Sequence, residues 1–305
     1  MSPPEYPGAT LKSNVHRRKA WFDRGARALK SVAAVDGEIY ACPICFRGFS
    51  SDALGQGLLT EDHVPPESLG GRPLVLSCRE CNNRAGHAFE SHMEKLDARL
   101  AFNRGQPRRP VRMKLRAWES TLRVMARGDD KTLTIDLGER GNNPADRDAH
   151  LKHLDEASRF PLRKFEFQMS FDDQLDMGAA RKGWLRSAYL VAFAAFGYHY
   201  AIHPQVRRLV ESLQESGFRA DNYVFLDGEA SLPANQILIL KDPTWLEGHI
   251  SISFGRCAIM LPGRRTPDPT FEQGLARLRD NSETAIHGRI IKWPRGLELR
   301  LDLPD

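Results

Sequence analysis

The sequence reads Cys42-Pro-Ile-Cys45, then Glu61-Asp62-His63-Val64-Pro65-Pro66, then Cys78-Arg-Glu-Cys81-Asn82-Asn83, and these stretches decide the fold of the first third of the chain. The outer two are Cys-x-x-Cys knuckles, and four thiolates paired in this way match the tetrahedral geometry that zinc prefers. Coordination by four thiolates leaves no open position for water. The spacing therefore predicts a structural Zn²⁺ held by Cys42, Cys45, Cys78 and Cys81.

Two other chemistries are open to four cysteines, a redox dithiol and a pair of disulfides. The chain opens with the polar stretch MSPPEYPGAT rather than an apolar signal peptide, so we expect a cytoplasmic protein. A reducing cytosol disfavours disulfides, and a redox motif does not need a second copy. The fifth cysteine, Cys257, lies in the apolar run SISFGRCAIM and is predicted to be a core thiol.

The residues between and after the knuckles predict two strands and a helix. We expect strands near Leu58–His63 and Leu74–Ser77, joined by a loop rich in proline and glycine, and a helix from about Arg79 to Phe102. Apolar residues recur along that helix at three- and four-residue intervals: Phe89, Met93, Leu96 and Leu100. The arrangement is ββα.

This ordered set resembles the HNH endonucleases over roughly Tyr40 to Met93. The match consists of a first Cys-x-x-Cys, an Asp-His-Val-x-Pro strand end, a Gly-Gly turn, an apolar strand and a Cys-x-x-Cys-Asn-Asn that opens a helix. The resemblance implies a ββα-metal module in which Asp62 and Asn82 hold the catalytic metal and His63 is the general base. It also implies products with a 5'-phosphate and a 3'-hydroxyl.

The chemistry of these residue types agrees with that implication. A hard divalent ion such as Mg²⁺ or Mn²⁺ prefers oxygen ligands, and a neutral imidazole takes a proton from water near physiological pH. His87 follows Asn82 on the same helix and is either a third ligand or a solvent-exposed or capping histidine. Arg84 is either a phosphate clamp or a surface charge.

One position departs from the family pattern. The asparagine that usually precedes the third cysteine by five residues, and braces the catalytic histidine, is replaced by Pro73. Another group must then orient His63, for which the backbone carbonyls of the loop from Pro65 to Gly71 are candidates. A module that binds nucleic acid without cutting it is the alternative.

The fold class expected for the whole chain is α+β in two domains. The first, residues 1–105, combines a basic leading helix over 11–33 with the HNH module, whose core is 40–93. The second, residues 106–305, is a mixed α+β domain whose role is specificity, regulation or assembly. Its expected elements are strands at 111–119, 121–128, 131–137 and 164–171, a turn at Gly128-Asp129-Asp130, helices at 144–157, 179–200 and 204–215, and mostly strands thereafter.

Charge and apolar content set further limits. The 305 residues are 41% hydrophobic, enough for a core without disulfides, and the net charge of +5 is a mild bias. Basic residues crowd two segments that flank the cysteines, and they are either solvated faces or phosphate contacts. These residues are Lys12, Arg17, Arg18, Lys19, Arg24, Arg27 and Lys30 in the first segment, and Arg104, Arg108, Arg109, Arg112, Lys114, Arg116, Arg123 and Arg127 in the second.

The segment from Trp184 to Ile202 is apolar but interrupted by polar residues, so it predicts a buried helix rather than a membrane span. Aromatic residues at helical spacing within it are expected to pack in the core: Trp184, Tyr189, Phe193, Phe196 and Tyr200. Basic residues at its start fit phosphate contact or a solvated helix end equally well, and no site is assigned to them: Arg181, Lys182 and Arg186.

The function expected from the sequence is metal-dependent hydrolysis of DNA, and RNA stays open as an alternative substrate. Two alternatives stay open: a zinc-ribbon protein that binds nucleic acid without cleaving it, and a bacterial defence effector whose nuclease is activated through the C-terminal domain. A homo-oligomer or an activating factor is a candidate partner, and no membrane association is expected.

Overall fold

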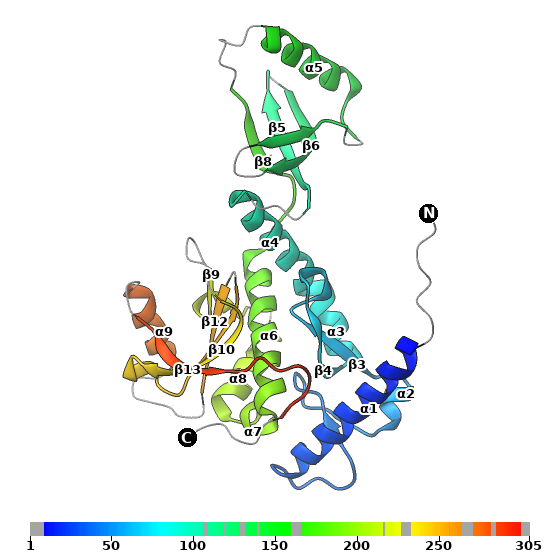
Figure 1. Cartoon of the computed structure of the whole chain (residues 1–305), viewed down its shortest axis with the longest axis vertical. Coiled ribbons are helices and arrows are strands. Elements are labelled where there is room, and N and C mark those ends of the chain that lie inside the picture. Colours follow the sequence, from blue (N-terminus) through cyan, green and yellow to red (C-terminus); the bar gives the residue numbers. More distant parts are fainter. Residues whose placement is uncertain are drawn as a thin grey trace. The chain divides into compact units, whose positions relative to one another are not determined.

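The computed structural model describes residues 9–105, 109–118, 120–128, 132–138, 141–159, 166–215, 217–226, 233–255, 257–263, 271–281 and 285–299. The fold mixes helices and strands, as expected for the α+β class, and divides into two units. Unit 1 comprises residues 1–91 and 178–305, and unit 2 comprises residues 92–177 (Figure 1). Unit 2 is thus inserted in unit 1, which differs from the single boundary expected at residue 105.

The reason for the difference lies in two long helical segments. The expected helix after Cys78 is formed by α3 (Arg79–Ala85), the π-helical η2 (Gly86–Glu90) and α4 (Ser91–Asn103), and it passes from unit 1 into unit 2 without a break. The chain returns to unit 1 at the start of α6 (Met177–Phe196). A boundary inside a helix gives no turn or linker signal in the sequence.

The N-terminal part of unit 1 contains the predicted ββα arrangement. Its strands β3 and β4 pair antiparallel, and α3 follows β4 directly. The described elements before α3 are α1 (Ala9–Lys30), β1 (Tyr40–Ala41), β2 (Gly48–Phe49), α2 (Asp52–Gly55), β3 (Leu59–Val64), η1 (Glu67–Leu69) and β4 (Arg72–Cys78).

Two glycines close the loop between β3 and β4. Gly70 has a φ of +84°, in the left-handed region that glycine favours. A Cβ on Gly71 would lie 1.4 Å from the carbonyl oxygen of Pro65, so no side chain fits there. The Gly-Gly pair thus allows the chain to return against the end of the strand that carries His63.

The predicted core helix is α6, and the aromatic residues assigned to the core are buried as expected. Two short helices follow it, α7 (Tyr198–Ala201) and α8 (Pro204–Ser212). Tyrosine hydroxyls from this region bind the first knuckle: Tyr189 donates to the carbonyl of Pro43 at 2.6 Å, and Tyr198 donates to that of Ala41 at 2.5 Å. Residues far apart in sequence therefore form one core in unit 1.

An antiparallel five-stranded sheet completes unit 1, with strand order β13-β10-β11-β12-β9. Helix α9 (Phe271–Asp280) packs with this sheet through Phe271 and Leu275, which join a cluster that includes Leu240 and Met260. The strands are β9 (Val224–Leu226), β10 (Ala234–Asp242), β11 (Ile250–Phe254), β12 (Cys257–Leu261) and β13 (His287–Ile291). Cys257 is buried in β12, as expected for a core thiol.

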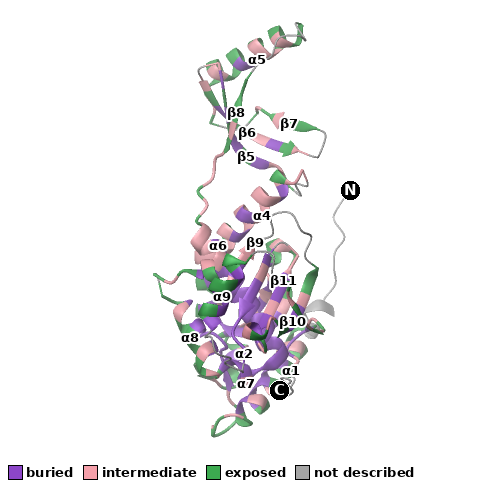
Figure 2. Ribbon diagram, turned by 90° about the vertical axis from the view of Figure 1, so that its left-hand side faces the viewer, coloured by how far each residue is buried: buried purple, intermediate pink, exposed green. Residues whose placement is uncertain are grey.

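Unit 2 is built on a four-stranded antiparallel sheet of order β7-β6-β5-β8. One face packs into a core that α4 reaches through Ala98 and Phe102. The described elements are β5 (Val111–Ala117), β6 (Ser120–Gly128), β7 (Leu133–Asp136), α5 (Pro144–Arg159) and β8 (Gln168–Phe171). Helix α5 consists mainly of half-buried and exposed residues (Figure 2).

These elements agree in type and place with the strands and the polar helix expected from sequence. The turn expected at Gly128-Asp129-Asp130 falls largely outside the described residues, because the structure describes Gly128 alone of the three. Across the part of the chain that is described, no helix has the length and apolarity needed to cross a membrane.

Candidate functional site

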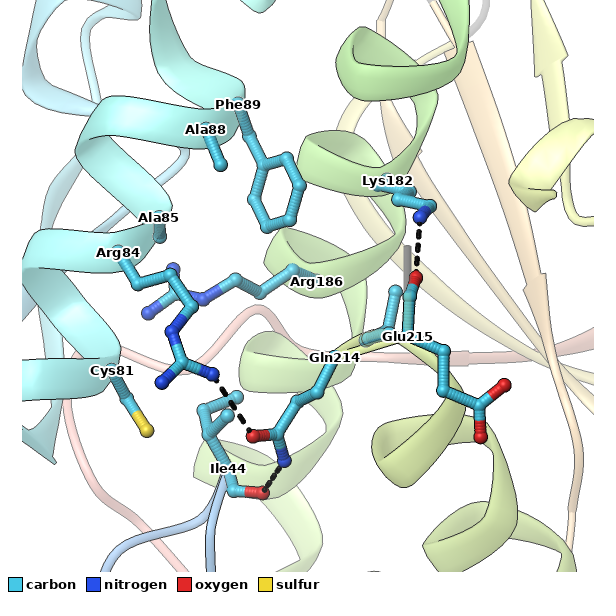
Figure 3. A pocket seen from close by; sticks show the side chains of 11 residues that line it. Ile44, Cys81, Arg84, Ala85, Ala88, Phe89, Lys182, Arg186, Gln214 and Glu215 are labelled. Atoms are coloured by element: carbon cyan, nitrogen blue, oxygen red, sulfur yellow. Dashed lines mark hydrogen bonds between the residues drawn. The ribbon is translucent and has the colours of Figure 1, made fainter. Parts of the chain in front are cut away.

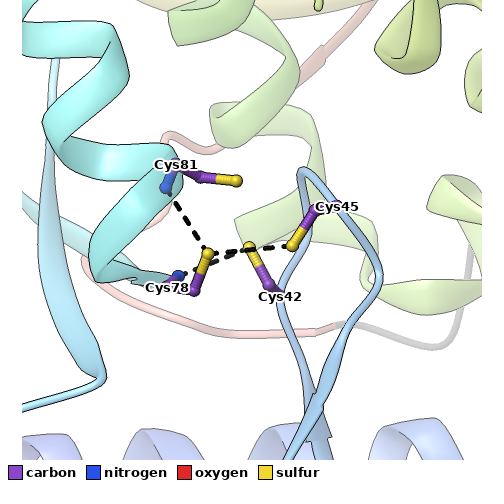
Figure 4. Close-up of side chains that lie close together, drawn as sticks. All are labelled: Cys42, Cys45, Cys78 and Cys81. Atoms are coloured by element: carbon purple, nitrogen blue, oxygen red, sulfur yellow. Dashed lines mark hydrogen bonds between the residues drawn. The ribbon is translucent and has the colours of Figure 1, made fainter.

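The four cysteines of the two knuckles converge in unit 1. Their sulfur atoms all lie within 4.8 Å of one another, and those of Cys45 and Cys78 are 3.7 Å apart (Figure 4). A Zn–S distance of about 2.3 Å in a tetrahedron places sulfurs about 3.8 Å apart. The predicted ligand set therefore fits one Zn²⁺, and it is the only group of three or more His, Cys, Asp or Glu ligands so clustered within the described ranges.

The electrostatics of the cluster also favour a cation. Hydrogen bonding to Cys42 lowers the pKa of Cys45 to about 6, whereas hydrogen bonds to Cys45, Cys78 and Cys81 raise the pKa of Cys42 well above its usual value. Arg47 donates to the sulfurs of Cys45 and Cys78 at 3.4 and 3.5 Å. Since four thiolates this close repel one another, a bound cation is what would let all of them ionise.

Asp62 lies at the centre of the ββα arrangement but is closed off from solvent, with 1% of its side chain exposed. Ser77 on β4 donates a hydrogen bond of 2.8 Å to its Oδ2. Arg186 on α6 donates to Oδ1 at 3.2 Å and also to Oδ2. Both carboxylate oxygens are therefore engaged, and a divalent ion does not fit at Asp62 while Arg186 is bound there.

Arg186 is a residue that sequence reasoning missed. The sequence assigned it to no site, and one interpretation placed it at a solvated helix end. In the structure only 8% of its side chain is exposed. Burial disfavours its charged form, yet the charge and hydrogen bonds of Asp62 outweigh that effect and raise its pKa. The available signal was the spacing of Lys182 and Arg186, one helical turn apart at the start of an apolar helix.

His63 follows Asp62 on β3 but is less buried than Asp62. It is half-buried, and a β-bulge between Asp62 and His63 shifts the register of the strand pair, which changes where its side chain points. His63 is paired with Pro73, the residue that replaces the expected asparagine. The imidazole of His63 makes no hydrogen bond to the described part of the chain. The carbonyls of the loop from Pro65 to Gly71, which were expected to orient it, therefore do not hydrogen-bond to it in this structure.

Asn82 faces the strand that carries Asp62 and His63. Its amide nitrogen donates to the hydroxyl of Thr60 at 3.1 Å and to the carbonyl of Glu61 at 3.2 Å. The Thr60 hydroxyl in turn donates to the carbonyl of Ser77, so both partners of Asn82 act as acceptors and fix the orientation of its amide. Its side-chain oxygen is left as the atom able to bind a cation.

The two residues assigned alternative roles from sequence are both exposed. His87 lies in the π-helical turn η2. Among the described residues it forms no potential metal-binding cluster with Asp62 or His63. Arg84 donates to Glu80 at 3.1 Å and to Gln214 at 3.4 Å. Both contacts of Arg84 are surface contacts, which agrees with the surface-charge reading and leaves phosphate binding untested.

A cavity of about 200 Å³ lies next to Arg186. Figure 3 shows Arg84 and Phe89 on one side of it and Lys182 on the other. Lys182 is 9% exposed and donates to the backbone carbonyl of Glu215 at 2.8 Å. The buried guanidinium of Arg186 is thus bordered by open space as well as by Asp62.

Three basic residues of α1 form contacts with other segments of unit 1: Arg17, Arg18 and Arg24. Arg17 forms two hydrogen bonds to Glu61, of 3.0 and 2.7 Å. Arg18 donates to the backbone carbonyls of Leu54 and Leu59, and Arg24 to that of Leu297. The contacts of Arg17 and Arg18 attach α1 to the segment that carries the candidate site.

Comparison with known proteins finds one similarity, in this part of the chain. Residues 42–97 match the model of an HNH endonuclease family. The matched range contains both knuckles, Asp62, His63 and Asn82. No curated protein and no solved structure matches the chain.

Proposed function

Because residues 42–97 match the HNH endonucleases, we propose that this protein hydrolyses phosphodiester bonds in nucleic acid, with DNA as the substrate. The observation that carries the proposal is the placement of His63. It lies at the end of β3, between the zinc-binding knuckles, with an imidazole that no described residue engages. A histidine in this state is able to accept a proton.

His63 is the general base of the proposed reaction. Its neutral imidazole takes a proton from a water molecule, and the oxygen of that water forms a bond to phosphorus. The bond between phosphorus and the 3' oxygen breaks, which leaves a 5'-phosphate and a 3'-hydroxyl after the leaving oxygen gains a proton from solvent. Asn82 and the Thr60 hydroxyl hold the start of α3 against the strand that carries His63.

The structural zinc and the divalent ion differ in how well the residues support them. Cys42, Cys45, Cys78 and Cys81 fit Zn²⁺ as they stand. The family resemblance assigns Mg²⁺ or Mn²⁺ to Asp62 and Asn82, where the ion would stabilise negative charge on the phosphate. That assignment requires Arg186 to leave Asp62 first.

This requirement favours a second form of the proposal, in which the nuclease is regulated. Arg186 belongs to the part of unit 1 that follows unit 2 in the chain, and its contact with Asp62 blocks the proposed ion site. A signal that moved α6 would then control access of the ion. Strong stimulation of cleavage by an added factor would distinguish this form from a constitutive enzyme.

The test is cleavage of supercoiled plasmid by zinc-loaded protein with Mg²⁺ or Mn²⁺, beside His63→Ala and His287→Ala. His287 is an exposed histidine on β13 and serves as the matched control. We expect nicking by the wild type and by the control, and loss of at least a hundredfold in rate for His63→Ala. Folded, zinc-loaded protein that cuts neither DNA nor RNA with either ion would favour the binding module.

A further inference from the structure

Unit 2 presents a strongly basic face on its sheet. Residues of β5 alternate between buried and exposed, and the exposed ones are Arg112, Lys114 and Arg116. On β6 the exposed residues include Arg123 and Arg127. We call these five residues the basic face: Arg112, Lys114, Arg116, Arg123 and Arg127.

The pairing register confirms that these side chains share one face. Lys114 is opposite Arg123 across β5 and β6, and opposite Ser170 across β5 and β8. Arg127 is opposite Thr134 on β7. Directly paired residues of an antiparallel sheet project to the same side, so the cations of β5 and β6 share this side with polar residues of β7 and β8 and with Met125.

The other side of the sheet explains the alternation. Val111, Met113 and Leu115 of β5 are buried in the core of unit 2 with Leu122 and Val124 of β6. The strands that carry the basic face are therefore held in place by the packed side chains on their other side. Cations recur every second residue along β5, about 7 Å apart, and neighbouring strands lie about 5 Å apart.

Two cations of this face, Lys114 and Arg123, share one carboxylate. Like charges directly opposite each other destabilise a sheet, and Lys114 and Arg123 are such a pair. Asp172 compensates both, at 3.0 and 3.2 Å. Asp136, on β7, is the one carboxylate on the same side of the described strands, and its Oδ1 accepts a hydrogen bond from the backbone of Gly138.

We propose that the basic face is a docking surface for the sugar-phosphate backbone of nucleic acid. Nucleic acid fits because duplex DNA carries one negative charge per about 1.7 Å of its axis, so several phosphates meet a surface with cations at this spacing. The described strands present no aromatic side chain on this side, which favours contact with phosphates over stacking on bases. The proposal rests on the proposed function, since it supplies the nuclease with its substrate.

The experiment measures binding rather than cleavage. Zinc-loaded full-length His63→Ala protein is titrated into a fluorescein-labelled DNA duplex without divalent ions, and Kd is measured by anisotropy from 50 to 200 mM KCl. The test variant adds Arg112→Gln, Arg116→Gln and Arg127→Gln. Lys114 and Arg123 are kept because their loss would leave Asp172, whose side chain is only 9% exposed, uncompensated.

A matched control removes the same number of charges elsewhere in unit 2. It carries Arg147→Gln, Lys152→Gln and Arg159→Gln, three exposed residues of α5. Circular dichroism and thermal unfolding verify that both variants are folded. Labelled single-stranded RNA of the same length is a second probe.

The salt dependence gives the decisive number. Each phosphate contact contributes about 0.9 to the slope of log K against log salt, so loss of three contacts reduces the slope by about 2.7. We expect this reduction and at least tenfold weaker binding at 150 mM KCl for the test variant, with a slope unchanged in the control. An unchanged slope in the test variant, or equal losses in both variants, would overturn the proposal.

The two proposals fail separately. Wild-type protein that binds DNA through the basic face but cuts no nucleic acid would refute the nuclease and keep the docking surface. Wild-type protein that cuts DNA, while the test variant binds it with an unchanged slope, would refute the docking surface alone. Tighter, basic-face-dependent binding to RNA than to DNA would keep the surface and change the proposed substrate.

Discussion

Asp62 and Arg186, which lie 124 residues apart in the chain, form an ion pair in which neither side chain is more than 8% exposed. The pair joins β3, which carries His63, to α6. The hydroxyl of Ser77 completes the contacts of the carboxylate at 2.8 Å. Charges this deeply buried depend on one another, because either one alone lacks the water that would stabilise it.

Replacing Arg186 with Met should therefore lower the free energy of unfolding by about 3–5 kcal/mol. The double variant Asp62→Asn, Arg186→Met should recover most of that loss, because no charge is then left unpaired. Urea unfolding measures both. Arg289→Met, on the exposed side of β13, is the control and should change stability by no more than about 0.5 kcal/mol. A double variant less stable than Arg186→Met would contradict this account.

The same pair predicts competition between Arg186 and a divalent ion. Mn²⁺ should bind the Arg186→Met variant at least tenfold more tightly than the wild type, because the Asp62 oxygens are released. Isothermal titration of zinc-loaded protein measures the affinities, and Asp62→Asn in the Arg186→Met background should abolish the gain. Equal Mn²⁺ affinity of the wild type and Arg186→Met would show that the ion does not use Asp62.

Zinc removal should unfold the knuckle region. Cys78→Ser should lose bound zinc and stability, because Cys78 belongs to the four-cysteine cluster that could hold the ion and also caps the start of α3. Cys257→Ser is the matched control, since Cys257 is buried in β12 and lies outside the cluster. Zinc content by mass spectrometry and far-ultraviolet circular dichroism test the expectation, which fails if Cys78→Ser retains the zinc content of Cys257→Ser.

His249 should make the protein less stable in acid. Burial lowers the pKa of His249 from about 6.5 to about 4, and its Nδ1 accepts a hydrogen bond of 2.9 Å from the backbone of Gly263. The unfolded chain binds this proton more readily than the folded one, so stability falls as pH drops from about 6.5 to 4, by up to about 3 kcal/mol.

The variant His249→Asn keeps an acceptor for Gly263 but does not titrate in this range. Its free energy of unfolding should therefore fall less steeply than that of the wild type between pH 6.5 and 4, as measured by urea unfolding at each pH. Parallel curves for the two proteins would mean that His249 does not carry this dependence.

Gly71→Ala should disturb the loop after His63. The added Cβ meets the carbonyl oxygen of Pro65, and relieving that clash should cost about 1–3 kcal/mol of stability and reduce any cleavage. Gly55→Ala is the control, because a Cβ there meets no atom within 4 Å. Thermal unfolding of the two variants compares them, and equal midpoints would contradict the expected clash.

The parts of the site that depend on short spacing were predictable from sequence. The two knuckles converge as their Cys-x-x-Cys pattern indicates, and the strands and helix of the ββα arrangement form where the apolar pattern places them. The residues involved all lie in one continuous stretch of the chain, between Tyr40 and Ala85. Local pattern is sufficient for features of this kind.

The contact of Arg186 with Asp62 was not predictable in the same way. It depends on the packing of α6 against the module, and a basic residue near a helix start has the same sequence pattern whether it is solvated or buried. The insertion of unit 2 was missed for a related reason, because the chain crosses both junctions within or at the edge of a helix. The roles assigned to His63, Asn82, His87 and Arg84 remain predictions.

The anchoring of the first knuckle by Tyr189 and Tyr198 has a consequence for synthesis on the ribosome. The cysteines emerge early, but the hydroxyls that bind their backbone emerge only after all of unit 2. Nascent chains that end before Tyr198 therefore lack part of the core that surrounds the knuckle. Any nuclease activity should accordingly be absent from chains that end before Tyr198.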